Sequence, residues 1–133
     1  MIIKFRKLIG DVTLPSYLWP DDAGLDLIPV AMIRINGDLH CYFGFAVEIP
    51  DGFAGFIFPW SSIFNYSLSH CDAMGVIVAG YRGEVKAVFR FSPAKDLFYA
   101  PGVAVARMII LPVSDIQPVR ADILSETSCG AGG

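Results

Sequence analysis

Two short segments bring together residues that could bind or hydrolyse a charged ligand. The segment 21–27, DDAGLDL, places three carboxylates around Gly24, a residue type that permits unusual backbone angles. The segment 75–85, GVIVAGYRGEV, is an apolar strand that turns through residues 80–83 and continues as a second strand. Taken alone, the first segment is more simply interpreted as an acidic loop before a strand, and the second as an ordinary β-hairpin.

The elements that must position these segments are short β-rich runs separated by turn signals. A helical period does not persist anywhere, and the best helical stretch, Ser61–Ser69, predicts at most a turn or two. Many short strands at this spacing indicate an all-β barrel or sandwich. The expected strands are Ile2–Leu8, Ala31–Ile35, Leu39–Ile49, Gly55–Pro59, Val76–Val78, Glu84–Phe91, Phe98–Ala100 and Ala106–Val113.

Length and composition predict one compact domain with a surplus of apolar side chains. The chain has 133 residues, of which 54% are hydrophobic and 17% are charged, whereas roughly 25% charged is usual. We expect one β domain over residues 1–124 and a mobile Gly/Ser-rich tail over residues 125–133. Because monomers seldom expose large apolar patches, the surplus indicates a subunit or partner interface.

Charge and hydropathy exclude several classes of partner. The formal net charge of −3 offers no basic footprint for a nucleic-acid polymer. Every long apolar run is interrupted, so we expect no membrane span. Cys41, Cys71 and Cys129 have no metal-ligand spacing, and we interpret them as small buried hydrophobes. The N-terminus lacks the features of a signal peptide, which favours a cytoplasmic location.

Four segments of the chain, taken in order, resemble the motifs of a known family. From near residue 14 onward the chain resembles the trimeric dUTPase family, in which five motifs appear in fixed order. The Gly-rich end CGAGG stops where the fifth motif would begin. The four matching segments are AGLDL at 23–27, PWSSI at 59–63, GVIVAGYRGEV at 75–85 and GVAVARMIILPV at 102–113.

This resemblance implies a fold and a site. The subunit is expected to be a β-barrel or jelly-roll-like fold with at most one short helix, assembled as a threefold homotrimer with sites between subunits. The third motif would bind deoxyuridine, with Tyr81 packed on the deoxyribose. The second and fourth motifs would hold the triphosphate, with Ser61 donating to a phosphate oxygen and Asp26 near magnesium-bound phosphates.

Several positions depart from the family pattern, among them Gly80 in place of a second aspartate and Val103-Ala104 in place of a polar pair. Val78 stands where the family has the aspartate that activates water, and Trp60 stands where it has a phosphate-binding arginine. Arg107 replaces a glutamine in the fourth motif, where it could restore positive charge to a vestigial phosphate site. It would need a counter-charge, for which Asp26 or Asp72 is the expected partner. We therefore expect no intact catalytic group, and a dry former phosphate site with Trp60 turned inward or against a partner.

The expectation that follows is a non-catalytic structural or regulatory homologue that needs no cofactor. It would act through a protein partner or in virion assembly, in the host cytoplasm or the virion if phage-encoded. The alternative is an active dUTP diphosphatase that hydrolyses dUTP to dUMP and pyrophosphate with Mg²⁺. Asp22, Asp26 or Asp72 would then orient the water. A deoxynucleotide sensor that binds dUTP or dUMP without turnover is a further alternative.

Overall fold

The structure is a computed structural model that describes residues 1–66, 68–71, 74–91 and 102–132. Strands make up nearly all of its regular structure, and the one helix in the described part is a single 3₁₀ turn, so the predicted all-β class is confirmed. The elements are β1 (Lys4–Lys7), β2 (Leu25–Leu27), β3 (Ala31–Ile35), β4 (Asp38–Tyr42), β5 (Phe45–Glu48), β6 (Phe53–Pro59), η1 (Ile63–Tyr66), β7 (Leu68–His70), β8 (Gly75–Val78), β9 (Lys86–Phe91) and β10 (Ala106–Pro112).

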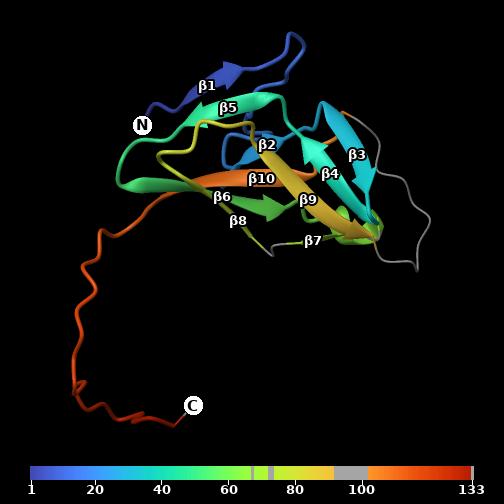
Figure 1. Ribbon diagram of the computed structural model, residues 1–133. Helices are drawn as coiled ribbons and strands as arrows, with labels where there is room; N and C mark the ends of the chain where they lie inside the picture. The colour runs from blue at the N-terminus through green and yellow to red at the C-terminus, as the bar shows by residue number, and fades with distance from the viewer. Residues whose placement is uncertain (67, 72–73, 92–101, 133) are drawn as a thin grey trace.

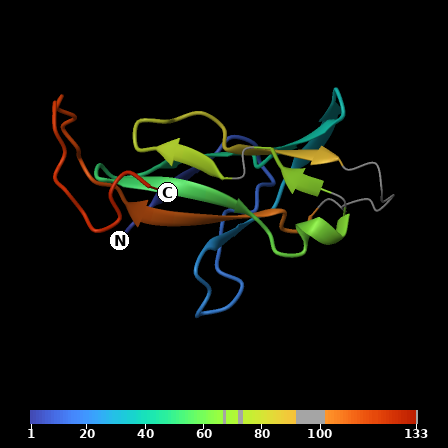
Figure 2. The same ribbon diagram turned by 90° about the horizontal axis from the view of Figure 1, so that it is seen from below.

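The strands form three antiparallel sheets (Figures 1 and 2). The orders are β1-β5, β2-β10-β6-β8 and β3-β4-β9-β7. Over the described residues the sheets do not join into one closed ring, so the fold is jelly-roll-like rather than a closed barrel. β10 and β6 form the longest pairing, in which Ala106 lies opposite Pro59 and Pro112 lies opposite Phe53.

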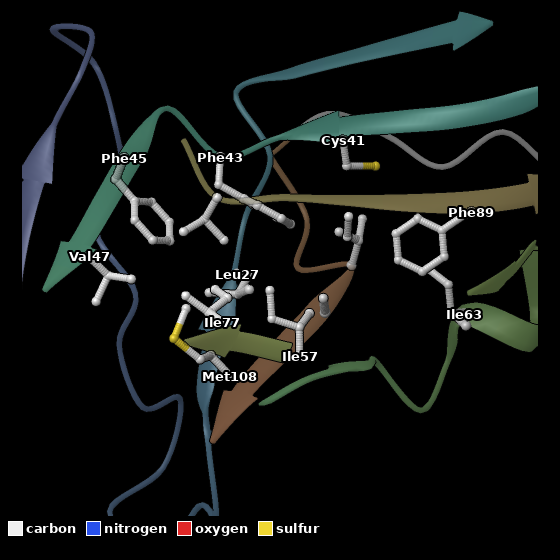
Figure 3. Packing of buried hydrophobic residues seen from close by; sticks show 14 of the residues in the cluster. Leu27, Cys41, Phe43, Phe45, Val47, Ile57, Ile63, Ile77, Phe89 and Met108 are labelled. Atoms are coloured by element: carbon white, nitrogen blue, oxygen red, sulfur yellow. The ribbon is translucent and has the colours of Figure 1, made fainter. Parts of the chain in front are cut away.

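The core lies between the sheets because alternate residues of each strand point inward. In β4, Leu39 and Cys41 are buried while their neighbours are partly exposed. Figure 3 shows Cys41 and Phe89 on one side of the core facing Ile57 and Met108 on the other. This arrangement removes the large apolar side chains from water, which is the main favourable term in folding.

A buried glycine divides the strand that was predicted over Leu39–Ile49. The structure has two strands there, because the chain bends at Gly44, which has a φ of +67°. A Cβ at this position would lie 2.7 Å from Cγ2 of the buried Val12, so only glycine fits. The bend lets β4 and β5 join different sheets.

The predicted hairpin over residues 75–85 is wrong. β8 pairs with β6, whereas β9 pairs with β4 and β7, so the loop 79–85 links two sheets instead of closing one ladder. The three-residue strands β2 and β7 were not predicted, because they are too short to show alternation. Phe98–Ala100 lies outside the described residues.

Past the end of β10 the chain runs away from the body (Figure 1). Residues 113–132 are exposed and contain no strand. In the part of the chain that the structure describes, no helix is long and apolar enough to cross a membrane. The mobility predicted for the tail at 125–133 stays a prediction.

Candidate functional site

The loop 79–85 closes one side of a cavity of about 240 Å³. The strand β8 supplies the floor through four consecutive residues, and β6 contributes one inward side chain. Backbone amide and carbonyl groups of β8 are therefore close to an apolar surface, which suits a flat, polar-edged ring. The lining residues are Ile57, Gly75, Val76, Ile77, Val78, Tyr81, Glu84 and Lys86.

Tyr81 is held against its own loop. Its hydroxyl donates a hydrogen bond to the carbonyl of Glu84 at 3.0 Å, and its amide donates to the carbonyl of Val78 at 3.0 Å. A Cβ on Gly83 would lie 2.5 Å from the Tyr81 hydroxyl, so the glycine is needed for this close packing. Tyr81 is 39% exposed and lines the cavity, and its packing on a sugar stays a prediction.

Glu84 has a role that the sequence reasoning missed. Its Oε1 accepts a hydrogen bond from the Gly44 amide at 2.9 Å, which ties the loop to the bend between β4 and β5. The backbone of Val85 bonds to Phe43 and Phe45 on either side of that bend. The only signal was a lone carboxylate at the start of a buried strand, which does not identify its partner.

Val78 stands where the sequence reasoning expected the family's water-activating aspartate. The side chain is 61% exposed and lies at the end of β8, opposite Ala54 of β6. Glu84 is the one carboxylate among the described residues that line this cavity, and its Oε1 is bonded to the Gly44 amide.

A second group of side chains gathers on β2 and β10 and just after β6. Asp26 Oδ1 accepts two hydrogen bonds, from Trp60 Nε1 at 2.9 Å and from Arg107 Nε at 3.0 Å. The Arg107 guanidinium lies 5.7 Å from the centroid of the Trp60 ring. The expected pairing of Arg107 with Asp26 is therefore present, whereas Asp72 lies outside the described residues. We call Asp22, Asp26, Trp60 and Arg107 the acidic-arginine cluster.

Asp22 joins the acidic-arginine cluster through a turn. Its Oδ2 accepts a hydrogen bond from the Trp19 amide at 2.9 Å, and its own amide donates to the Trp19 carbonyl at 3.1 Å. Its Oδ1 lies 3.6 Å from Nη1 of Arg107. The side chains of Asp22 and Asp26 are 17% and 10% exposed, so the two carboxylates face one guanidinium with little water between them.

A glycine is required at position 24 for a different reason from the one expected. Its backbone does not take a positive φ, but a Cβ there would lie 2.6 Å from Cγ of Arg107 and 2.9 Å from Cγ1 of Ile109. Because Gly24 has no side chain, it leaves the space that the Arg107 side chain occupies when it reaches Asp26.

Ser61 lies beside this group in a second cavity of about 250 Å³. The serine is exposed, and Trp60 before it is fixed by a hydrogen bond from its amide to the Val105 carbonyl at 2.9 Å. A hydroxyl and a guanidinium on one cavity wall can both donate to an anion. The lining residues are Ala23, Phe58, Pro59, Trp60, Ser61, Arg107 and Ile109.

Asp26 and Val78 lie on the two edge strands of one sheet. In the order β2-β10-β6-β8, Asp26 and Val78 are three strand spacings apart, or about 14 Å. Along β6, Trp60 follows the last residue whereas Ala54, opposite Val78, is the second, a separation of roughly 20 Å. Within one chain, Val78 and Trp60 therefore do not share a pocket.

The described residues contain no group of three or more His, Cys, Asp or Glu side chains placed to hold a metal ion. Asp22 and Asp26 lie near each other, and Arg107 contacts both carboxylates. A cation at this site would need further oxygen ligands, such as those of a bound phosphate chain.

Comparison with known proteins gives consistent likenesses. The dUTPase family model matches residues 11–133. The deoxyuridine 5'-triphosphate nucleotidohydrolase of Thermobifida fusca is 34% identical over 135 residues, covering 98% of this chain and 75% of that protein. The Clostridium tetani protein of the same name is 30% identical, covering 98% of this chain and 92% of that protein.

Solved structures show the same fold. A Staphylococcus bacteriophage 80alpha dUTPase mutant with dUpNHpp superposes with a TM-score of 0.82 at 17% identity, covering 99% of this chain and 95% of that chain. The dUTPase of phage phi11 of S. aureus gives 0.79 at 17% identity, covering 96% of this chain and all of that chain.

The expectation of a non-catalytic homologue is wrong. The relatives that share 30–34% identity with this chain carry the name of a nucleotidohydrolase, which favours the active alternative. The expectation was drawn from replaced motif positions, whereas the likeness to named nucleotidohydrolases extends over nearly the whole chain. The pseudoenzyme and viral predictions find no support in these likenesses.

The family assignment therefore rests on nearly the whole chain and not on the four short segments alone. Since the family model and the relatives agree, the chain belongs to the dUTPase family.

Proposed function

We propose that this chain is a dUTP diphosphatase, which hydrolyses dUTP to dUMP and pyrophosphate with Mg²⁺. Relatives that match almost the entire chain at 30–34% identity are named for this hydrolysis, and that observation carries the proposal. The arrangement of the Tyr81 loop supports it, because a nucleoside-sized cavity has a fixed aromatic wall and open backbone groups.

The proposed roles divide between the two cavities. Deoxyuridine binds against β8 and the loop 79–85, where Tyr81 packs on the sugar. The triphosphate lies against Ser61 and the acidic-arginine cluster, where Asp26 faces the metal-bound phosphates. Mg²⁺, when bound, neutralises the charge that develops on the leaving pyrophosphate.

The reaction requires a base for the attacking water. The water oxygen bonds to the α-phosphorus, the bond from that phosphorus to the bridging oxygen breaks, and the water proton passes to the base. Of the two described candidates, Asp26 accepts two hydrogen bonds from side chains, whereas Asp22 accepts one from the Trp19 amide on Oδ2 and has a 3.6 Å contact on Oδ1. We therefore assign the base to Asp22.

A homotrimer would bring the two cavities together. The outward face of the sheet β2-β10-β6-β8 carries apolar side chains that an isolated subunit leaves in water, among them Val76 at 55%, Val78 at 61% and Leu111 at 43% exposed. Burying these side chains against a second copy would set the Tyr81 cavity of one subunit beside the acidic-arginine cluster of the next. Light scattering that gives three times 14.5 kDa supports this, and a monomer at micromolar concentration contradicts it.

The test of the function is product formation by the purified chain. With millimolar Mg²⁺, dUTP should give equal amounts of dUMP and pyrophosphate, and excess EDTA should stop the reaction. UTP should react poorly because its 2'-hydroxyl meets Tyr81. A matched control is Arg90→Gln, which removes an exposed ion pair with Asp38 on another sheet and should leave the rate unchanged. Absence of pyrophosphate above background would refute the proposal, and binding without turnover would indicate a sensor. A cytoplasmic location remains a prediction.

A further inference from the structure

We infer that Arg107 is the cation that holds the triphosphate, and that Asp26 and Trp60 fix its direction. The inference rests on the proposed function, because it concerns the same ligand, and it gives Arg107 the role that the resemblance assigns to an arginine at position 60. In the family pattern the positive charge belongs at residue 60. Here residue 60 is an indole, and the guanidinium stands on β10 instead.

The position of Arg107 is fixed by its neighbours. It lies in β10 between Asp26 of β2 and Phe58 of β6, and its stem crosses the space left by Gly24. Nε donates to Asp26 and Nη1 faces Asp22. A guanidinium with contacts on two sides and an aromatic ring on a third has few other conformations to adopt.

The Arg107 guanidinium has hydrogen-bond donors that remain available to a ligand. An arginine carries five N–H groups, and the contacts within the acidic-arginine cluster use Nε and Nη1. Nη2 has no partner among the residues that the structure describes. Arg107 and Ser61 line the same cavity of about 250 Å³, so both can donate to one phosphate chain.

Trp60 makes this arrangement possible by replacing a charged donor with a neutral one. Its Nε1 donates to the same oxygen of Asp26 that Arg107 uses, at 2.9 Å, and adds no second positive charge. Its ring lies 5.7 Å from the guanidinium, within the range of a cation–π contact. Compared with the family pattern, the cation has therefore moved from position 60 to position 107 on the adjacent strand.

The charge of the acidic-arginine cluster determines which form of the ligand it accepts. Two carboxylates against one guanidinium leave it net negative, so a bare triphosphate is repelled. A triphosphate that carries Mg²⁺ brings a cation toward Asp22 and Asp26 while its oxygens face Nη2. Arg107 is therefore expected to act on the magnesium complex and not on the free nucleotide.

Calorimetry on the full chain tests the inference. The ligands are dUMP and an α,β-imido analogue of dUTP, whose bridging nitrogen resists cleavage, each with and without Mg²⁺. Arg107→Gln should weaken the magnesium analogue by about 10- to 100-fold, the range for a lost charged hydrogen bond. The affinity for dUMP should change by less than about 3-fold, because only the outer phosphates reach Arg107.

The double variant Trp60→Arg with Arg107→Gln returns the cation to position 60. It should recover at least half of the loss in logarithmic terms, a coupling that independent sites do not show. Arg107→Lys keeps the charge without Nε and should fall between the wild type and Arg107→Gln. Circular dichroism checks that each variant folds, and Arg90→Gln is the matched control.

The possible outcomes distinguish a failure of the inference from a failure of the proposed function. Unchanged analogue affinity in Arg107→Gln, or an equal loss for dUMP and analogue, would overturn the inference, since the second result marks a purely structural role. Failure of the wild type to bind either ligand would overturn it as well. Analogue binding that depends on Arg107, without pyrophosphate release from dUTP, would refute the proposed function and leave the inference standing.

Discussion

Gly24→Ala is the sharpest test of how the acidic-arginine cluster is built. The new methyl group would lie 2.6 Å from Cγ of Arg107 and 2.9 Å from Cγ1 of Ile109, both inside the contact limit. Cγ is near the base of the arginine side chain, so rotating the guanidinium does not relieve the clash. Arg107 must leave Asp26 or the strand β2 must move.

The magnitude follows from two opposing terms. Overpacking a tight site costs about 1–3 kcal/mol, whereas replacing glycine by alanine restricts the unfolded chain and stabilises by about 0.4–1 kcal/mol. Because Gly24 does not have a positive φ, alanine adds no backbone strain. We expect Gly24→Ala to lower the free energy of unfolding by on the order of 1 kcal/mol.

Urea denaturation at one fixed protein concentration measures this change, and a double-mutant cycle assigns its cause. In an Arg107→Ala background Cγ and Cδ are gone, so Gly24→Ala should cost less than in the wild type. The same variant should weaken the magnesium analogue in calorimetry. A Gly24→Ala protein that is more stable than wild type and binds the analogue unchanged would refute the reasoning.

Three further predictions concern single side chains. Asp22→Asn should lower kcat by roughly 10²–10⁴, and a steady-state assay that shows an unchanged kcat would exclude Asp22 as the base. Tyr81→Phe should lose the bond to the Glu84 carbonyl and weaken dUMP binding by less than about 10-fold, as calorimetry would show; an unchanged affinity would mean that the bond is irrelevant to binding. Burial raises the pKa of the Cys41 thiol to about 12, so its stabilising contribution is complete below pH 9 and is lost as the pH rises through 12. Cys41→Val should therefore lose stability less steeply than wild type between pH 9 and 12, and parallel denaturation curves across that range would contradict this.

The sequence predicted the strands whose side chains alternate clearly. β3 was predicted at its observed bounds and β10 to within one residue, because apolar residues recur along both runs. The bend at Gly44 could not be predicted, since a glycine between two phenylalanines also fits an unbroken strand. The pairing of β8 with β6 depends on contacts far along the chain, which local patterns do not contain.

The site was predictable in part for the same reason. Asp26 or Asp72 was expected beside Arg107 because a lone buried cation needs a counter-charge, and the ion pair with Asp26 is present at 3.0 Å. The contact of Trp60 with the same carboxylate was not expected, because the indole was judged only as a bulky apolar group. The inference from Val78 to lost catalysis failed because a missing group at one position does not show which carboxylates the fold brings in from elsewhere.

The bond between Glu84 and the bend at Gly44 has a consequence for the timing of recognition. The loop that forms the wall of the proposed nucleoside cavity is hydrogen-bonded to the same bend that lets β4 and β5 enter different sheets, and Tyr81 is bonded within that loop. The freedom of the loop is therefore given up when the protein folds and not when the ligand arrives. Preorganisation of this kind means that nucleoside association needs no slow ordering step, and that the cavity keeps its shape until the core itself melts.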